Sequence, residues 1–158
     1  MAGIKFNNFI TSKIYYERNP KFYKGERLNI SPSYRCEITE NNLEATVKLS
    51  AVIDSRKDIE VPFFIDVEVI GFFEYIVEES ENIEFEDYLT TSAIAILFPY
   101  LRSVIADVTA GSNEFPVLYL PVANISKMLV EQDAINYIRV SKKYLRAYLF
   151  VTEVPLLL

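Results

Sequence analysis

Between residues 43 and 53, apolar and polar side chains alternate more strictly than anywhere else in this chain. The apolar positions are Leu43, Ala45, Val47, Leu49, Ala51 and Ile53. Successive side chains of a β-strand point to opposite faces of a sheet, so this period of two predicts a strand with one buried face. Polar turns are expected on both sides of it, at 40–42 and 54–58.

The neighbouring segments extend this sheet. A short alternating segment around Cys36 precedes the first turn, and a longer strand is expected from about residue 60 to 77. Gly71 interrupts that strand and predicts a bulge or a bend there. Together with segment 6–16, which mixes aromatic, β-branched and polar residues, they give four strands. Short turns between consecutive strands favour an antiparallel meander.

Beyond residue 93 the apolar spacing becomes helical. Its positions are Ile94, Leu97, Leu101, Val104, Ile105 and Val108. Pro99 has no amide hydrogen, so the helix must begin near it or bend at it, and Gly111 is placed to end it. A segment between two prolines follows, and then a short helix over 125–132. The pattern predicts an α+β fold, a four-stranded antiparallel sheet followed by a long helix and a second short helix packed on one face.

Composition narrows the possible functions. The 158 residues carry a net charge of −6 and include no histidine. No basic run offers a phosphate-binding surface, so nucleic acid is not an expected partner. Without histidine there is no Ser-His-Asp triad or histidine metal site, and Cys36 is interpreted as a small buried residue. The acidic residues at 78–86 are interpreted as a solvated loop. We expect no enzyme activity, no cofactor, no metal, no membrane insertion and a cytoplasmic location.

Two proline motifs carry a family resemblance. They read Ile96-Leu97-Phe98-Pro99-Tyr100-Leu101-Arg102 and Phe115-Pro116-Val117-Leu118-Tyr119-Leu120-Pro121-Val122. Both resemble motifs of the SecB family of protein-export chaperones, and Lys13-Ile14-Tyr15 is similar to part of that family's first strand. The resemblance covers about residues 9–132 of a single domain over 1–158. Residues 133–158 form a divergent C-terminal extension that fits a helix or a strand. We expect it to pack on the protein's own apolar surface and to restrict the groove described next.

The resemblance implies a chaperone. It would be an ATP-independent holdase that binds unfolded preproteins, or one dedicated client protein, in a hydrophobic groove. By position, the groove residues are Phe22, Tyr23, Leu118, Leu120, Val122, Ile125, Met128 and Leu129. Aromatic side chains offer large apolar areas, and a methionine repacks easily against varied partners. The alternative interpretation of the chain's many aromatic residues, among them Phe22, Tyr23 and Phe63, is ordinary core and oligomer interface.

The resemblance also implies partners. The resemblance implies the assembly of that family, in which two dimers form a tetramer. We therefore expect a homotetramer, with Leu97, Tyr100, Leu101, Val104 and Ile105 at the interface. Phe64 and Asp66 match positions that dock the SecA motor. Basic residues at Arg18 and Lys21 intrude on the family's acidic docking segment. This departure favours a chaperone dedicated to one partner, such as an antitoxin, and a non-chaperone scaffold on the same fold is the remaining alternative.

Overall fold

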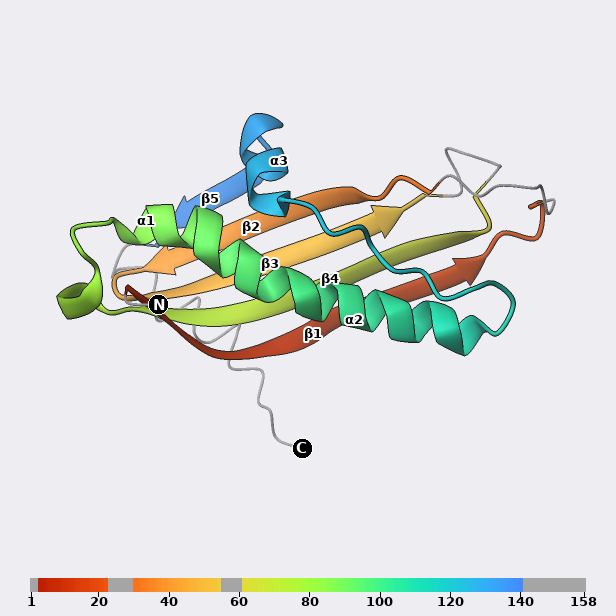
Figure 1. The fold of residues 1–158 in the computed structure, drawn as a ribbon, viewed down its shortest axis with the longest axis horizontal. Helices are drawn as coiled ribbons and strands as arrows, with labels where there is room; N and C mark the ends of the chain where they lie inside the picture. Colours follow the sequence, from red (N-terminus) through yellow and green to blue (C-terminus); the bar gives the residue numbers. More distant parts are fainter. Residues whose placement is uncertain (1–2, 23–29, 55–60, 141–158) are drawn as a thin grey trace.

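A computed structural model describes residues 3–22, 30–54 and 61–140. They form one sheet with helices on one of its faces (Figure 1). The strands are β1 (Ile4–Arg18), β2 (Ser33–Asn41), β3 (Glu44–Ile53), β4 (Phe63–Tyr75) and β5 (Ile135–Arg139). Their order across the sheet is β1-β4-β3-β2-β5. The first four strands pair antiparallel, whereas β5 lies parallel to β2.

The predicted meander is confirmed for β2, β3 and β4. Asn42 makes the tight turn between β2 and β3 and has a positive φ of 55°. Asparagine tolerates this left-handed conformation better than most residues, because its short polar side chain can bond locally. The predicted number of strands was wrong, since β5 adds a fifth. It forms from the first part of the C-terminal extension, and residues 141–158 lie outside the described part of the chain.

The core lies between the sheet and the long helix. The alternating residues of β3 face it as predicted, except that Leu43, in the turn, is exposed. From β4 the same face presents Phe63, Ile65, Val67, Val69 and Phe73, all of them buried.

Gly71 is required for packing rather than for a bulge. A Cβ at this position would lie 2.7 Å from Cε2 of Phe73 and 3.1 Å from Cδ1 of Leu97. The register shifts occur instead in the opposite strand β1, between Phe6 and Asn8 and between Thr11 and Lys13. Of the predicted bulge or bend at Gly71, the bulge was therefore wrong. The glycine lets the long helix approach the sheet closely.

The long helix begins earlier than predicted. It comprises α1 (Phe85–Tyr88), a π-helical turn (Leu89–Ala93) and α2 (Ile94–Ser112). Pro99 lies inside α2. Because Pro99 has no amide hydrogen, the carbonyl of Ala95 lacks its usual helical hydrogen bond. Both residues are exposed, so water can bond to this carbonyl instead.

The helix end also differs from the prediction. The helix passes Gly111 and stops at Asn113, which takes the left-handed conformation that commonly ends helices. By length and composition alone, Phe85–Ser112 is apolar enough to cross a membrane. In this structure Leu97, Leu101 and Ile105 are fully buried in the core, whereas Ile96, Val104 and Val108 are half-buried. One side of this helix therefore packs on the sheet.

An extended connection leads back along α2 to α3 (Ile125–Glu131), which lies near β2 and β5 (Figure 1). The short helix confirms the prediction to within one residue. Its cap is Asn124, whose side chain accepts a hydrogen bond from the amide of Lys127 at 3.0 Å.

Candidate functional site

The connection between α2 and α3 is held against the long helix by hydrogen bonds that each join a side chain of one segment to the backbone of another. The hydroxyl of Thr109 accepts from the amide of Leu118 at 2.9 Å, and Nε of Arg102 donates to the carbonyl of Leu120 at 2.9 Å. Ser126 at the start of α3 donates to the carbonyl of Thr90 at 2.6 Å. Pro116 and Pro121 cannot donate backbone hydrogen bonds, and the connection forms no strand with the sheet. The side-chain hydrogen bonds therefore fix its path.

Alternation along this fixed path turns some apolar side chains inward and others outward. Leu120, Ile125 and Leu129 are buried, whereas the outward residues are Tyr119 (70% exposed), Val122 (85%), Met128 (36%) and Val130 (57%). We call these four exposed side chains, two on the connection and two on opposite flanks of α3, the outer apolar surface. A shallow hollow of about 640 Å³ lies beside it, lined by residues of the long helix and α3 that include Ala95, Ser126 and Val130.

The outer apolar surface overlaps only partly with the predicted groove. Val122 and Met128 are exposed as a groove requires, and Leu118 is half-buried. The prediction was wrong for Leu120, Ile125 and Leu129, because these side chains anchor the connection and α3 in the core. Phe22 packs edge-on against Phe115, with ring centroids 5.7 Å apart. Tyr23 lies outside the described residues.

Sequence reasoning missed Tyr119 and Val130. The missed signal was present in the chain: in an extended segment Tyr119 must point opposite to Leu118 and Leu120. In a helix, Ile125 and Leu129 are four residues apart and share one side, which turns their neighbour Val130 outward.

The predicted oligomer interface on α2 also divides in two. Leu97, Leu101 and Ile105 are fully buried against the subunit's own sheet, so the prediction was wrong for these three. Val104 is half-buried. Tyr100 is partly exposed and stacks on Phe9 of β1, with ring centroids 4.2 Å apart. The exposed residues of α2 are Ala95, Pro99, Tyr100, Ser103, Asp107, Ala110 and Gly111.

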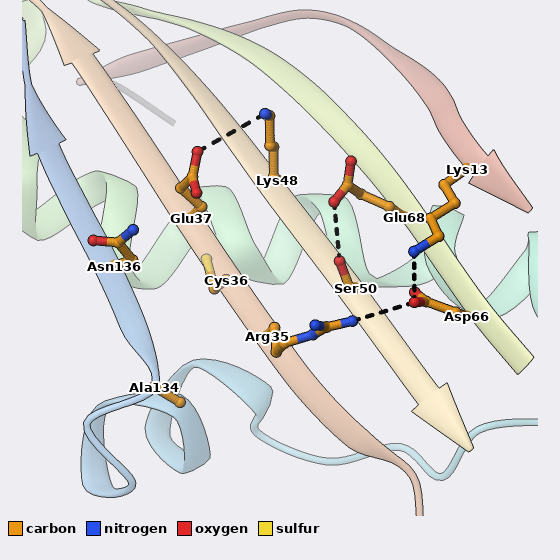
Figure 2. A pocket seen from close by; sticks show the side chains of 10 residues that line it. All are labelled: Lys13, Arg35, Cys36, Glu37, Lys48, Ser50, Asp66, Glu68, Ala134 and Asn136. Atoms are coloured by element: carbon orange, nitrogen blue, oxygen red, sulfur yellow. Dashed lines mark hydrogen bonds and ion pairs between the residues drawn. The ribbon is translucent and has the colours of Figure 1, made fainter. Parts of the chain in front are cut away.

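The opposite face of the sheet carries the positions predicted for motor docking. The carboxylate of Asp66 contacts Nζ of Lys13 at 2.6 Å and a guanidinium nitrogen of Arg35 at 3.3 Å (Figure 2). Phe64 is buried, and Tyr15 packs edge-on against its ring. A polar hollow of about 370 Å³ surrounds Asp66. Two cations therefore pair with this acid.

Reactive groups are few in the described part of the chain. It holds no cluster of three or more histidine, cysteine, aspartate or glutamate residues that could bind a metal ion. Cys36 is buried, as predicted, and burial raises the pKa of its thiol to about 12, so it is a poor nucleophile near neutral pH. At the surface, the hydrogen bond between Arg18 and Glu114 lowers the pKa of the glutamate. What the site offers is an apolar contact surface on a fixed backbone.

This combination of a helix-covered sheet and an anchored apolar connection defines a protein suited to binding other polypeptides. Residues 5–135 match the family described as preprotein translocase subunit SecB. The chain belongs to the SecB family. This membership supports a chaperone role rather than an enzymatic one.

Individual relatives agree with the family. The chain is 30% identical over 153 residues to the uncharacterized protein MJ0357 of Methanocaldococcus jannaschii, a match that covers 93% of this chain and 96% of the relative. It is 37% identical over 93 residues to the protein-export protein SecB of Anaplasma phagocytophilum, covering 57% of each chain.

A solved structure shows the same fold. It is the SecB-like chaperone Rv1957 of Mycobacterium tuberculosis in complex with a ChAD peptide from the HigA1 antitoxin. The TM-score is 0.60 at 16% identity, and the match covers 77% of this chain and 91% of that one.

Proposed function

We propose that this protein is an ATP-independent holdase that binds extended apolar segments of non-native polypeptides on the outer apolar surface. The observation that carries the proposal is the exposure of Tyr119, Val122, Met128 and Val130 on two segments that side-chain hydrogen bonds tie to the long helix. Two of these bonds hold the backbone of the connection, and the third joins Ser126 of α3 to Thr90. A fixed backbone loses little entropy when a client binds, so more of the apolar contact energy is available for affinity.

The side chains suit a broad but weak recognition. Tyr119 offers a large area with few rotatable bonds, and Met128 can adapt its shape to different client residues. By holding the unfolded state of a client, the protein would lower the concentration of chains free to aggregate. The mechanism requires no cofactor and no covalent step, and it can operate in the cytoplasm.

The chaperone could serve protein export or one dedicated client. The ion pairs of Asp66 favour a dedicated client. Its contacts with Lys13 and Arg35 leave little net negative charge at the position where the family resemblance implies SecA docking. The solved structure of a SecB-like chaperone with an antitoxin peptide is a precedent for a dedicated client. We therefore expect much tighter binding to one client segment than to SecA, a comparison that calorimetry with both partners can make.

A homotetramer is part of the proposal. In the described residues β1 pairs only with β4, so its outer edge, including the 57% exposed Ile14, is available to another copy. An uncovered edge of 15 residues would be an aggregation hazard. The outward side of α2, with its small residues, offers a second contact. Light scattering at micromolar concentration should show four subunits, and a strict monomer would contradict this assembly.

The test of the holdase function is suppression of aggregation of a reduced, unfolded model client without ATP. Converting Met128 and Val130 together to aspartate should abolish suppression, because both side chains are exposed and can carry charge without unfolding the protein. The matched control converts Leu43 and Val77 to aspartate. Both are exposed apolar residues outside this surface, and this variant should act like the wild type.

Equal suppression by the two variants would place the client surface elsewhere. Failure of the wild type with every client, including extended apolar peptides, would favour the scaffold alternative.

A further inference from the structure

The edge of β2 is occupied by a strand that differs from the rest of the sheet. β5 lies parallel to β2, with Cys36 opposite Ile135, Ile38 opposite Tyr137 and Glu40 opposite Arg139. Every other pair of strands in the described residues is antiparallel. The match to the SecB family ends at residue 135, where β5 begins. β5 thus lies almost entirely beyond the part of the chain that the family model matches.

β5 is short, and only Ile135 and Tyr137 among its side chains pack against the core. It has five residues, and none of them is fully buried. Arg139 bonds Glu40 of β2 at 2.9 Å and also Glu86 of α1, but the arginine is exposed, so these ion pairs contribute little stability. Most of the attachment is the backbone ladder with β2, and a ladder does not depend on the sequence of the added strand.

One side chain of β5 fits its place poorly. The hydroxyl of Tyr137 is buried and has no hydrogen-bond partner of normal geometry in the described residues, and Glu40 beside it is only a poorly placed acceptor. Burial, with the nearby charges of Glu40 and Glu86, raises the pKa of this phenol. A buried hydroxyl without a well-placed partner destabilises the strand, whereas a phenylalanine or leucine side chain in the same place would not carry this cost.

The place that β5 fills is suited to an extended segment with apolar residues at alternate positions. Ile135 and Tyr137 both point to the helix-covered face, two residues apart. α3, with Met128 and Val130, leads directly into β5 through the turn at Asp133. A polypeptide bound at α3 therefore lies near the edge of β2.

We propose that the edge of β2, over Cys36–Glu40, is a strand-accepting site for an extended apolar client segment, and that β5 is the chain's own occupant, which the client displaces. This inference rests on the proposed holdase function. The exchange makes client affinity depend on how often β5 leaves the edge, since a site that is free for only a fraction of the time binds more weakly by that fraction.

The chain offers a direct way to lock β5. Cys36 is the only cysteine in the sequence, and it lies opposite Ile135 on the neighbouring strand. Adjacent strands are about 4.8 Å apart, within the span that a disulfide bridges. In the variant Ile135→Cys a disulfide would tie β5 to β2. Because the buried thiol is a poor nucleophile, the bond is best formed by refolding with oxidised glutathione.

The experiment measures the affinity of a fluorescent peptide with alternate apolar residues by anisotropy. The oxidised Ile135→Cys variant should bind about tenfold or more weakly than the same variant after reduction. The control, Ile135→Ala through the same oxidation and reduction, should show no difference. A second variant, Tyr137→Phe, should raise the melting temperature and weaken peptide binding, because it removes the poorly paired hydroxyl and stabilises β5 in its place.

The outcomes separate this inference from the function on which it rests. Equal, measurable affinity of the oxidised and reduced forms would overturn strand exchange and leave the holdase function standing. Peptide binding that Tyr137→Phe strengthens would also overturn it. No binding by any form, the wild type included, would overturn both proposals.

Discussion

The hydroxyl of Thr109 should decide whether the connection stays docked on the long helix. The side chain is fully buried, donates to the carbonyl of Ile105 at 2.9 Å and accepts from the amide of Leu118 at 2.9 Å. Replacement by valine keeps a similar shape but removes the acceptor. The Leu118 amide, which is half-buried, would then have no partner on the helix.

Leaving a buried donor unpaired costs about 1–3 kcal/mol of the free energy of unfolding. Water can partly reach Leu118, so the lower half of this range is expected. For a chain of this size, each kcal/mol lowers the melting temperature by roughly 2–4 °C. A local loss of about 1.4 kcal/mol corresponds to a tenfold change in an equilibrium constant. The amide of Leu118 should therefore exchange its hydrogen about tenfold faster in Thr109→Val than in the wild type.

The matched control is Thr109→Ser, which keeps the hydroxyl and removes one methyl group. It should also lose about 1 kcal/mol, because a buried methyl group is removed from the core. Stability alone cannot separate the two variants, so the hydrogen exchange of Leu118 and the client affinity are the deciding measurements. Only the valine variant should release Leu118 and weaken client binding. Unchanged protection of Leu118 in Thr109→Val, or equal loss in both variants, would refute the role given to the hydroxyl.

Three further predictions concern packing, the thiol and the short helix. Gly71→Ala should lower the free energy of unfolding by about 1–3 kcal/mol in urea titrations, because its methyl group would press on Phe73. Gly111→Ala has open space around it and should raise the free energy of unfolding by roughly 0.5–1 kcal/mol. A destabilised Gly111→Ala would contradict this comparison. Burial raises the pKa of Cys36 from 9.0 to about 12, so stability should fall as pH rises between these values, and Ellman's reagent at pH 8 should react only after unfolding; rapid reaction of the folded protein would show that the thiol is accessible. Asn124→Ala should cost about 1 kcal/mol, measured by thermal unfolding, through loss of the α3 cap, and an unchanged melting temperature would mean that the cap is not needed.

Much of the fold could be predicted from local patterns. The alternation in β3, the turn at Asn42 and the amphipathic spacing of α2 follow from residues close together in the chain, so periodicity reveals them. The proline motifs around Pro99 and Pro116 also led to the SecB family, which the comparison over residues 5–135 shows.

Other features depended on contacts between distant segments. The helix continues through Pro99 because that side of it faces solvent, and Gly71 is needed because Leu97 packs above it. β5 pairs with β2 about a hundred residues earlier in the chain, a contact that no local period announces.

The candidate site shows the same division. The sequence determined that segment 115–132 is rich in apolar residues. Hydrophobicity alone does not distinguish Leu129 from its neighbour Val130. The helical spacing indicates that Leu129 shares a side with Ile125, and tertiary structure decided that this side, not the one with Val130, packs into the core. The physical reason is that burial depends on which side of each element meets the core. That side is set by contacts between distant segments, among them the hydrogen bonds that Arg102 and Ser126 donate to backbone carbonyls and that Thr109 accepts from a backbone amide.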